Sequence, residues 1–161
     1  VLTKLIGQTG SKALISLGVL SSLILMVIGY KAETFHPIYN TPSFGIHLNN
    51  LLMFVSIGLL GLVHGKSRLK KHVRHPMLTA VITWSAAHLL VNGDVSSVLL
   101  FGLLGLWSAA LIILINRAEA IPKLQHNLSL RGDIRWFIIT VFIFTLISYI
   151  HYFLGAYPFP S

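Results

Sequence analysis

Five long apolar runs without a charged residue constrain this chain more than any other feature. They cover residues 13–30, 48–63, 77–91, 95–115 and 136–154. Of the 161 residues, 55% are hydrophobic and only 10% are charged, and the mean hydropathy is +0.80. Ordinary soluble domains do not reach these values. The composition therefore predicts an integral membrane protein.

The runs are longer than barrel strands and show no alternation of period two, so we expect α-helices. At 1.5 Å per residue they reach about 22 to 31 Å, and the second and third are short for an apolar core of about 30 Å. The predicted fold is all-α, a polytopic transmembrane helix bundle of about five spans that forms one domain over residues 1–161. The first run is not followed by a small-x-small cleavage site, so we do not expect a cleaved signal peptide.

Basic residues predict the orientation of the bundle, because short loops rich in Lys and Arg are retained on the cytoplasmic side. Eleven of the 12 basic residues precede the first run or lie between the second and third or the fourth and fifth. We expect a cytoplasmic N-terminus and an outside C-terminus. The eleven are Lys4, Lys12, Lys66, Arg68, Lys70, Lys71, Arg74, Arg117, Lys123, Arg131 and Arg135, and Lys31 alone lies on the other side.

Composition also limits the partners and cofactors. The net charge of +8 follows from the loop bias, and anionic lipid headgroups are the expected counter-charges. Nucleic acid is not expected as a partner, because the basic residues are divided between loops without an aromatic-interleaved patch. The chain has no cysteine, so any metal or haem must depend on histidine.

Several reaction classes lack their motifs. The chain has no P-loop, no Gly-x-Ser-x-Gly elbow and no His-Glu-x-x-His sequence. A proton-coupled carrier is not expected, because no acid lies at mid-membrane. Glu33 and Asp94 are predicted outside, and Glu119 and Asp133 inside. In the long loop before the last run, Lys123–His126 could form a short amphipathic helix.

The predicted topology sorts the histidines into two layers. His47, His88 and His151 come from three different runs and fall in the outer leaflet, at a depth shared with Asn49, Asn50, Asn92 and Asp94. His64, His72, His75 and His126 belong to the basic loops, where a solvated or headgroup-contacting imidazole is the simplest interpretation of most of them.

His88 is the strongest candidate for a binding residue. Trp84, His88 and Asn92 follow at intervals of four and share one helix face, which we expect to point into the bundle. A buried neutral imidazole needs two partners, and a metal or haem iron could take one ring nitrogen. The alternative is an interhelical hydrogen bond to a Ser, Asn or backbone carbonyl.

Each of the other candidates also has a structural alternative. His151 lies among Tyr149, Tyr152 and later aromatic residues, so it could belong to an interfacial aromatic belt or to a ligand set. His47, with Asn49 and Asn50, could cap the second helix. Asp94 could cap the fourth helix or orient a histidine, and His75 could fix the start of the third helix next to Pro76 or line a site that faces the cytoplasm.

Motifs spread over most of the chain resemble the NnrU family of bacterial membrane proteins. They are His47–Met53, His64–Leu69, Arg74–Leu78, Trp84, Ala87–Asp94, Ile115–Glu119 and Asp133–Arg135. The resemblance implies an association with nitrite and nitric oxide reduction, without an established reaction. A plant relative, the 15-cis-zeta-carotene isomerase, contains the same domain and uses haem b.

The resemblance places a haem-ligand role on His88, which lies thirteen residues after the Arg-His-Pro histidine, here His75. The isomerase takes its other ligand from an earlier helix, and typical family members begin with an additional apolar helix that we do not find in this chain. Either the natural chain begins before Val1, or any second ligand comes from His47, His151 or a neighbouring chain.

The leading hypothesis is an inner-membrane protein that holds haem b or a similar planar group between helices, through His88 with His47 or His151, for redox or isomerase chemistry. Trp84, Asn92 and Asp94 would complete its surroundings. The alternative is a non-catalytic accessory subunit that packs against a larger respiratory, denitrifying or photosynthetic complex. Whether the chain is an enzyme stays open at this point.

Overall fold

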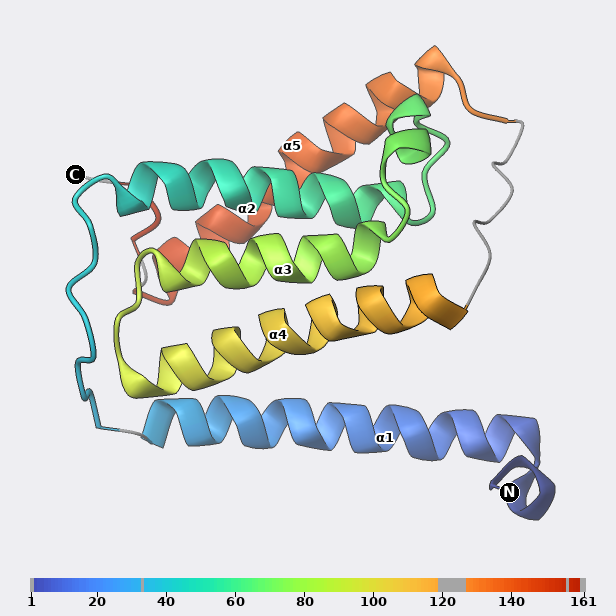
Figure 1. The fold of residues 1–161 in the computed structure, drawn as a ribbon, viewed down its shortest axis with the longest axis horizontal. Helices are drawn as coiled ribbons and strands as arrows, with labels where there is room; N and C mark the ends of the chain where they lie inside the picture. The colour runs from blue at the N-terminus through green and yellow to red at the C-terminus, as the bar shows by residue number, and fades with distance from the viewer. Residues whose placement is uncertain (1, 33, 119–126, 156, 160–161) are drawn as a thin grey trace. The chain divides into compact units, whose positions relative to one another are not determined.

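All regular structure in the described residues is helical, which confirms the predicted all-α class. The computed structural model describes residues 2–32, 34–118, 127–155 and 157–159. Beyond the helices these residues contain only an isolated bridge between Pro37 and Asp94. The elements are α1 (Leu2–Ala32), α2 (Gly45–Leu62), the 3-10 helix η1 (Arg68–His72), α3 (Pro76–Leu89), α4 (Val95–Ala118) and α5 (Leu130–Phe153) (Figure 1).

Four helices are long and apolar enough to cross a membrane, which indicates a membrane protein. They are Ile6–Tyr30 within α1 and the whole of α2, α4 and α5. The third predicted run forms the 14-residue α3, whose length of about 21 Å is short of an apolar core of about 30 Å. The orientation of the chain stays a prediction.

Several helices extend beyond the charge-free runs that predicted them. α5 begins at Leu130, six residues before Trp136, because the Ser129 hydroxyl accepts a hydrogen bond from the Gly132 amide at 3.1 Å and caps the helix. Charged residues end an apolar run, but they do not end backbone hydrogen bonding. The predictions for Glu33, Glu119 and residues 123–126 lie outside the described residues.

α1 belongs to a separate compact unit, residues 1–36. Its helical course is interrupted at Gly7, where φ is +71°, a conformation that glycine adopts without steric cost. The Ser11 hydroxyl donates to the Gly7 carbonyl oxygen at 2.8 Å. The described side chains of its apolar span are almost all exposed, as expected of a helix that meets lipid.

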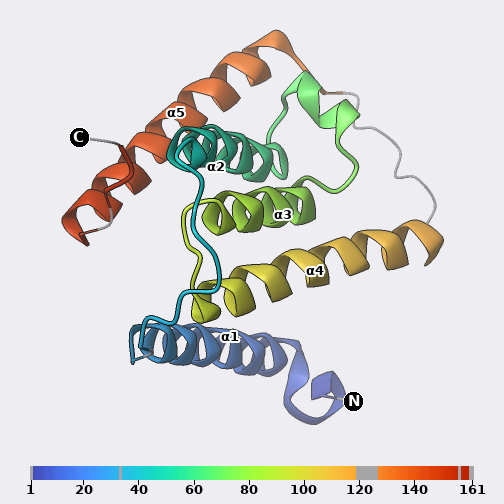
Figure 2. The ribbon, with the colours of Figure 1, turned by 60° about the vertical axis from the view of Figure 1, so that its left-hand side comes forward.

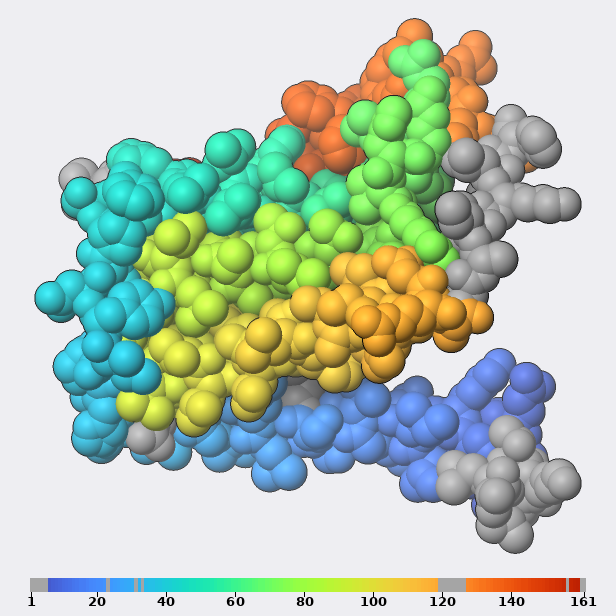
Figure 3. Space-filling model, viewed as in Figure 1, coloured from blue at the N-terminus to red at the C-terminus, as the bar shows by residue number. Residues whose placement is uncertain are grey.

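In the second unit, residues 37–161, α2 is the central helix. It packs against α3 on one side and α5 on the other, and α3 packs in turn against α4 (Figures 1 and 2). The space-filling view shows α2, α3 and α4 side by side along one face (Figure 3). Small residues fill the contacts between helices: Ala80 is 1% and Ala87 0% exposed, and the buried Ser56 hydroxyl donates to the Ala80 carbonyl oxygen at 2.8 Å.

The contact between α2 and α5 depends on two glycines and one indole. Trp136 Nε1 donates to the Gly58 carbonyl oxygen at 2.6 Å. A Cβ at Gly58 would lie 2.9 Å from the ring, and one at Gly61 would lie 3.2 Å from it. Both glycines therefore let α5 approach α2 closely, and Gly105 does the same for α4 where it faces Ser85 of α3.

The loop after α2 is tied to the start of α5. The Asp133 carboxylate accepts hydrogen bonds from the Ser67 hydroxyl at 2.8 Å, the Arg68 amide at 2.7 Å and the Arg68 guanidinium at 2.6 Å. The Ser129 amide donates to the Lys66 carbonyl oxygen at 3.0 Å. This junction also requires Gly132, because a Cβ there would lie 2.2 Å from the same carbonyl oxygen.

The α2–α5 contact predicts a destabilised Trp136→Phe variant. Phe cannot donate to the Gly58 carbonyl oxygen, and interhelical hydrogen bonds in membranes contribute about 1 kcal/mol. We expect a lower melting temperature in detergent than for the wild type. Trp107→Phe is the matched control, because Trp107 is 55% exposed, and it should melt like the wild type. An equal decrease of the melting temperature in both variants would contradict this role for Trp136.

Candidate functional site

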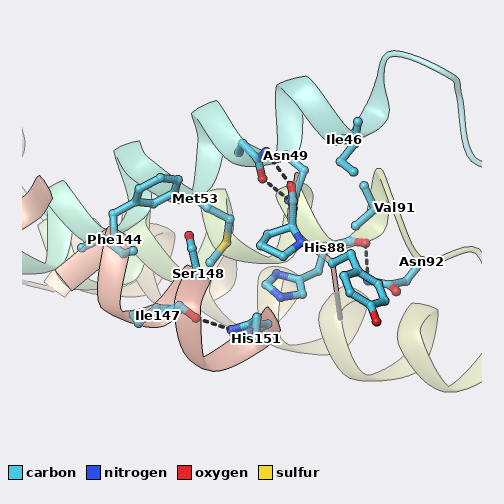
Figure 4. Close-up of a pocket in the computed structure, with 14 residues that line it drawn as sticks. Ile46, Asn49, Met53, His88, Val91, Asn92, Phe144, Ile147, Ser148 and His151 are labelled. Carbon is cyan, nitrogen blue, oxygen red and sulfur yellow. Dashed lines mark hydrogen bonds between the residues drawn. The ribbon is translucent and has the colours of Figure 1, made fainter. Parts of the chain in front are cut away.

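A cavity of about 340 Å³ lies between α2, α3, α5 and the C-terminal segment (Figure 4). It exists because α3 and α5 both pack on α2 without packing extensively on each other. Its apolar walls are Met53, Ile57, Val91, Phe144 and Ile147, and its polar lining includes Asn49, Asn50, His88, Asn92, Ser148, His151 and Tyr157.

His88 is half-buried and contributes an imidazole with a defined proton position. Nδ1 lies 3.0 Å from the Trp84 carbonyl oxygen, one helical turn earlier. A carbonyl oxygen can only accept, so Nδ1 carries the proton and Nε2 keeps its lone pair. The ring stacks on Phe101 of α4, with centroids 4.4 Å apart and planes at 25°, and it lies 4.8 Å from the Trp84 ring.

His151 repeats this arrangement from α5. Its Nδ1 lies 2.9 Å from the Ile147 carbonyl oxygen, so Nε2 again keeps its lone pair. His88 and His151 line the same cavity (Figure 4). Metal-ligating histidines usually donate their other ring nitrogen to a carbonyl or carboxylate in this way, although a structural helical histidine can also do so.

His47 is not brought to this cavity. It lies in the first turn of α2 with an exposed side chain. The capping interpretation of His47, Asn49 and Asn50 is wrong, because α2 begins at Gly45 and its N-cap, Phe44, has no side-chain hydrogen bond.

Asn49 and Asn50 instead face the cavity. Asn50 Nδ2 donates to the Pro158 carbonyl oxygen at 2.7 Å, and Asn49 Nδ2 donates to Asn50 Oδ1 at 3.2 Å. The C-terminal segment is thereby held against α2. The sequence did not predict this contact, because nothing in a chain's pattern shows where a terminal segment returns.

Asn92 and Trp84 have different positions around His88. Asn92 lines the cavity, and its Nδ2 donates to the His88 carbonyl oxygen at 2.9 Å. Trp84 packs against the imidazole and lines a neighbouring cavity of about 450 Å³. The two cavities share Met53, Ile57, Ile147 and His151, so they adjoin along α2 and α5.

Asp94 does not line either cavity and caps α4, which confirms the capping interpretation. Its carboxylate accepts hydrogen bonds from the Ser97 amide at 2.9 Å and the Ser97 hydroxyl at 2.6 Å. Burial raises the pKa of Asp94, but these hydrogen bonds outweigh burial, and the pKa lies below its ordinary value.

Tyr39 is a residue that sequence reasoning missed. Its hydroxyl donates to the carbonyl oxygens of Leu89 and Asn92, where α3 ends, and burial together with Asp94 raises its pKa. The turn also approaches the Tyr39 backbone so closely that a Cβ at Gly93 would lie 2.2 Å from the Tyr39 carbonyl oxygen. The Asn-Gly sequence signalled a tight turn, but it did not indicate its partner.

His75 lies at the other end of α3, thirteen residues from His88. Its Nε2 donates to Asn116 Oδ1 of α4 at 2.8 Å, and Pro76 occupies the first position of the helix. These contacts favour the structural interpretation of His75, because they tie the start of α3 to the end of α4.

Comparison with known proteins decides the family. A family model described as NnrU protein matches residues 1–158, nearly the whole chain. The chain belongs to the NnrU family. No curated protein and no solved structure matches this NnrU-family chain.

The described part of the NnrU-family chain contains no group of three or more His, Asp or Glu residues that could hold a metal ion. A metal held by protein ligands alone therefore has no support there. Haem differs, because the porphyrin supplies four ligands and the protein needs to supply only one or two. Two imidazoles at one cavity satisfy that lower requirement.

The Asp94 cap predicts an acid-sensitive contribution to stability. A carboxyl whose pKa is lowered on folding stabilises the fold above its unfolded pKa, and this stabilisation disappears as the pH falls below about 4. Asp94→Asn keeps an N-cap but lacks the ionised carboxylate, so it should be less stable than the wild type at pH 7 and should lose less stability between pH 5 and pH 3. Thermal unfolding in detergent measures this, and parallel pH profiles would rule out the assigned role.

Proposed function

We propose that this NnrU-family membrane protein binds haem b, or a planar group of similar chemistry, between α2, α3 and α5 through His88 and His151. The observation that supports the proposal is a pair of imidazoles on two helices, each with its Nδ1 proton donated to its own helix. Both therefore offer an Nε2 lone pair at the same cavity.

The rest of the cavity fits such a group. The apolar walls of Met53, Ile57 and Phe144 suit a porphyrin ring, and the side chains of Asn49 and Asn50 could hydrogen-bond haem carboxylates. The two adjoining cavities, of about 340 and 450 Å³, reach the size of ordinary cofactor sites.

The chain's own residues would bind and orient the group and keep water from it. The rings of Trp84, Phe101 and His88 pack against one another, which restricts the orientation of the imidazole. Pro158, held by Asn50, covers part of the cavity. A bound haem would supply redox or isomerase chemistry on a lipophilic or small diatomic ligand, linked to denitrification or carotenoid metabolism in the bacterial inner membrane.

The second candidate is a non-catalytic accessory subunit of a larger membrane complex. It is favoured by the exposed aromatic end of α5, where Tyr149 is 62%, Tyr152 56% and Phe153 67% exposed. A partner helix could cover this surface, but an interfacial aromatic belt explains it equally well. The haem proposal also explains the paired imidazoles, so we prefer it.

Variants of the three outer histidines test the proposal. We expect protein purified in detergent from haem-replete cells to give a pyridine haemochrome of b type. His88→Ala should reduce the haem content at least about tenfold, and His151→Ala should shift or reduce the Soret band, since each removes a candidate ligand. His47→Ala is the matched control and should bind haem like the wild type. Haem-free wild-type protein would contradict the proposal.

Gentle solubilisation separates the two candidates. If the chain functions by itself, the 17.8 kDa protein should migrate on a sizing column as a species containing only its own polypeptide, with haem absorbance in the same fraction. Co-elution with stoichiometric larger subunits, without haem, would favour the accessory role.

A further inference from the structure

A separate cavity, of about 420 Å³, lies at the opposite end of α5 from His151. It is formed by the end of α2 with the following loop and by the first turns of α5. Its lining includes His64, Lys66, Arg131 and Arg135, together with Trp136 and Ile139. None of these residues takes part in the haem site proposed above.

The cavity is lined with cations and, among the described residues, with no acid. The nearby Asp133 is engaged by Ser67 and Arg68, and within the described part of the chain no carboxylate forms an ion pair with Lys66, Arg131 or Arg135. Arg131 and Arg135 are one helical turn apart, where like charges repel. An anion between them would attract both guanidinium groups and so offset their repulsion.

The junction described above keeps this charge in place. The Ser129 amide holds the Lys66 carbonyl oxygen at 3.0 Å, and Gly132 lets the two backbones approach closely. The backbones that carry Lys66, Arg131 and Arg135 are therefore held together around one space. The N-terminal end of the α5 dipole adds positive potential to that space.

The cavity is also amphipathic, which selects among anions. Trp136 anchors α5 to Gly58 at 2.6 Å, and tryptophan is the residue typical of the membrane interface. Ile139 continues the lining toward the apolar part of α5. A free anion would use only the charged part, whereas a lipid would also lay an acyl chain against the apolar part.

We propose that this cavity binds the headgroup of an anionic phospholipid. The net negative phosphodiester lies among Lys66, Arg131 and Arg135, and an acyl chain follows Trp136 and Ile139 along α5. A zwitterionic phosphatidylcholine headgroup brings its own cation into the same space and therefore binds less tightly.

Quenching of Trp136 by brominated lipids tests this proposal. The full chain carrying Trp84→Phe and Trp107→Phe, with Trp136 as its one tryptophan, is titrated in detergent with dibrominated phosphatidylglycerol or phosphatidylcholine. We expect half-maximal quenching at about tenfold less phosphatidylglycerol than phosphatidylcholine. Equal concentrations for the two lipids would overturn the proposal.

Charge variants locate the effect. With Arg131→Gln and Arg135→Gln added, the concentrations of the two lipids that give half-maximal quenching should differ by no more than about threefold. Lys71→Gln with Arg117→Gln removes the same charge outside the cavity, and this control should keep the preference for phosphatidylglycerol. Loss of the preference in both pairs would overturn the site. If the variant with Arg131→Gln and Arg135→Gln fails to fold, the proposal is still tested by the lipid preference of the protein that carries only the two Trp→Phe changes.

A competition experiment distinguishes a lipid from a free anion. Unbrominated phosphatidylglycerol should restore the fluorescence quenched by its brominated form, and inorganic phosphate at ten millimolar should not. Full recovery with phosphate would show a site for free anions and overturn the lipid assignment.

Discussion

The close approach of α2 to its two neighbours is the constraint on which the second unit depends. Helices in lipid gain little from burying apolar side chains against each other, so they associate through small residues and hydrogen bonds. α2 meets α3 at the bond between Ser56 and Ala80, and it meets α5 at the bond between Gly58 and Trp136. Because both neighbours pack on α2, a space remains between α3 and α5, and the two imidazoles face that space.

The sequence predicted how deep each histidine lies along its helix better than it predicted to which side the imidazole points. Apolar runs and helical rise were enough to place His88 and His151 in one layer, and the spacing of four put His88 and Asn92 on one face. The sequence did not predict which face of α2 points toward α5, because the helix is apolar on most sides. In the structure Gly58 and Gly61 form that face, since they pack against Trp136. For that reason His47 was a candidate, although the structure leaves it exposed.

Helix ends were also difficult to predict from composition. The charge-free run predicted the start of the last helix at Trp136, but α5 begins at Leu130 and its first two turns carry Arg131 and Arg135. The loop junction that holds these residues depends on Asp133 and Ser67, which are 66 positions apart. Local patterns do not contain such pairings, and the basic cavity became visible only in three dimensions.

The most direct test of the central claim, that His88 and His151 face one cavity, uses the absence of native cysteine. In H88C/H151C, a short thiol-reactive cross-linker applied in membranes should join α3 to α5, and mass spectrometry of the digested protein should identify the linked peptides. The pair H47C/H88C should give no such product. Efficient cross-linking of the second pair and none of the first would contradict the arrangement.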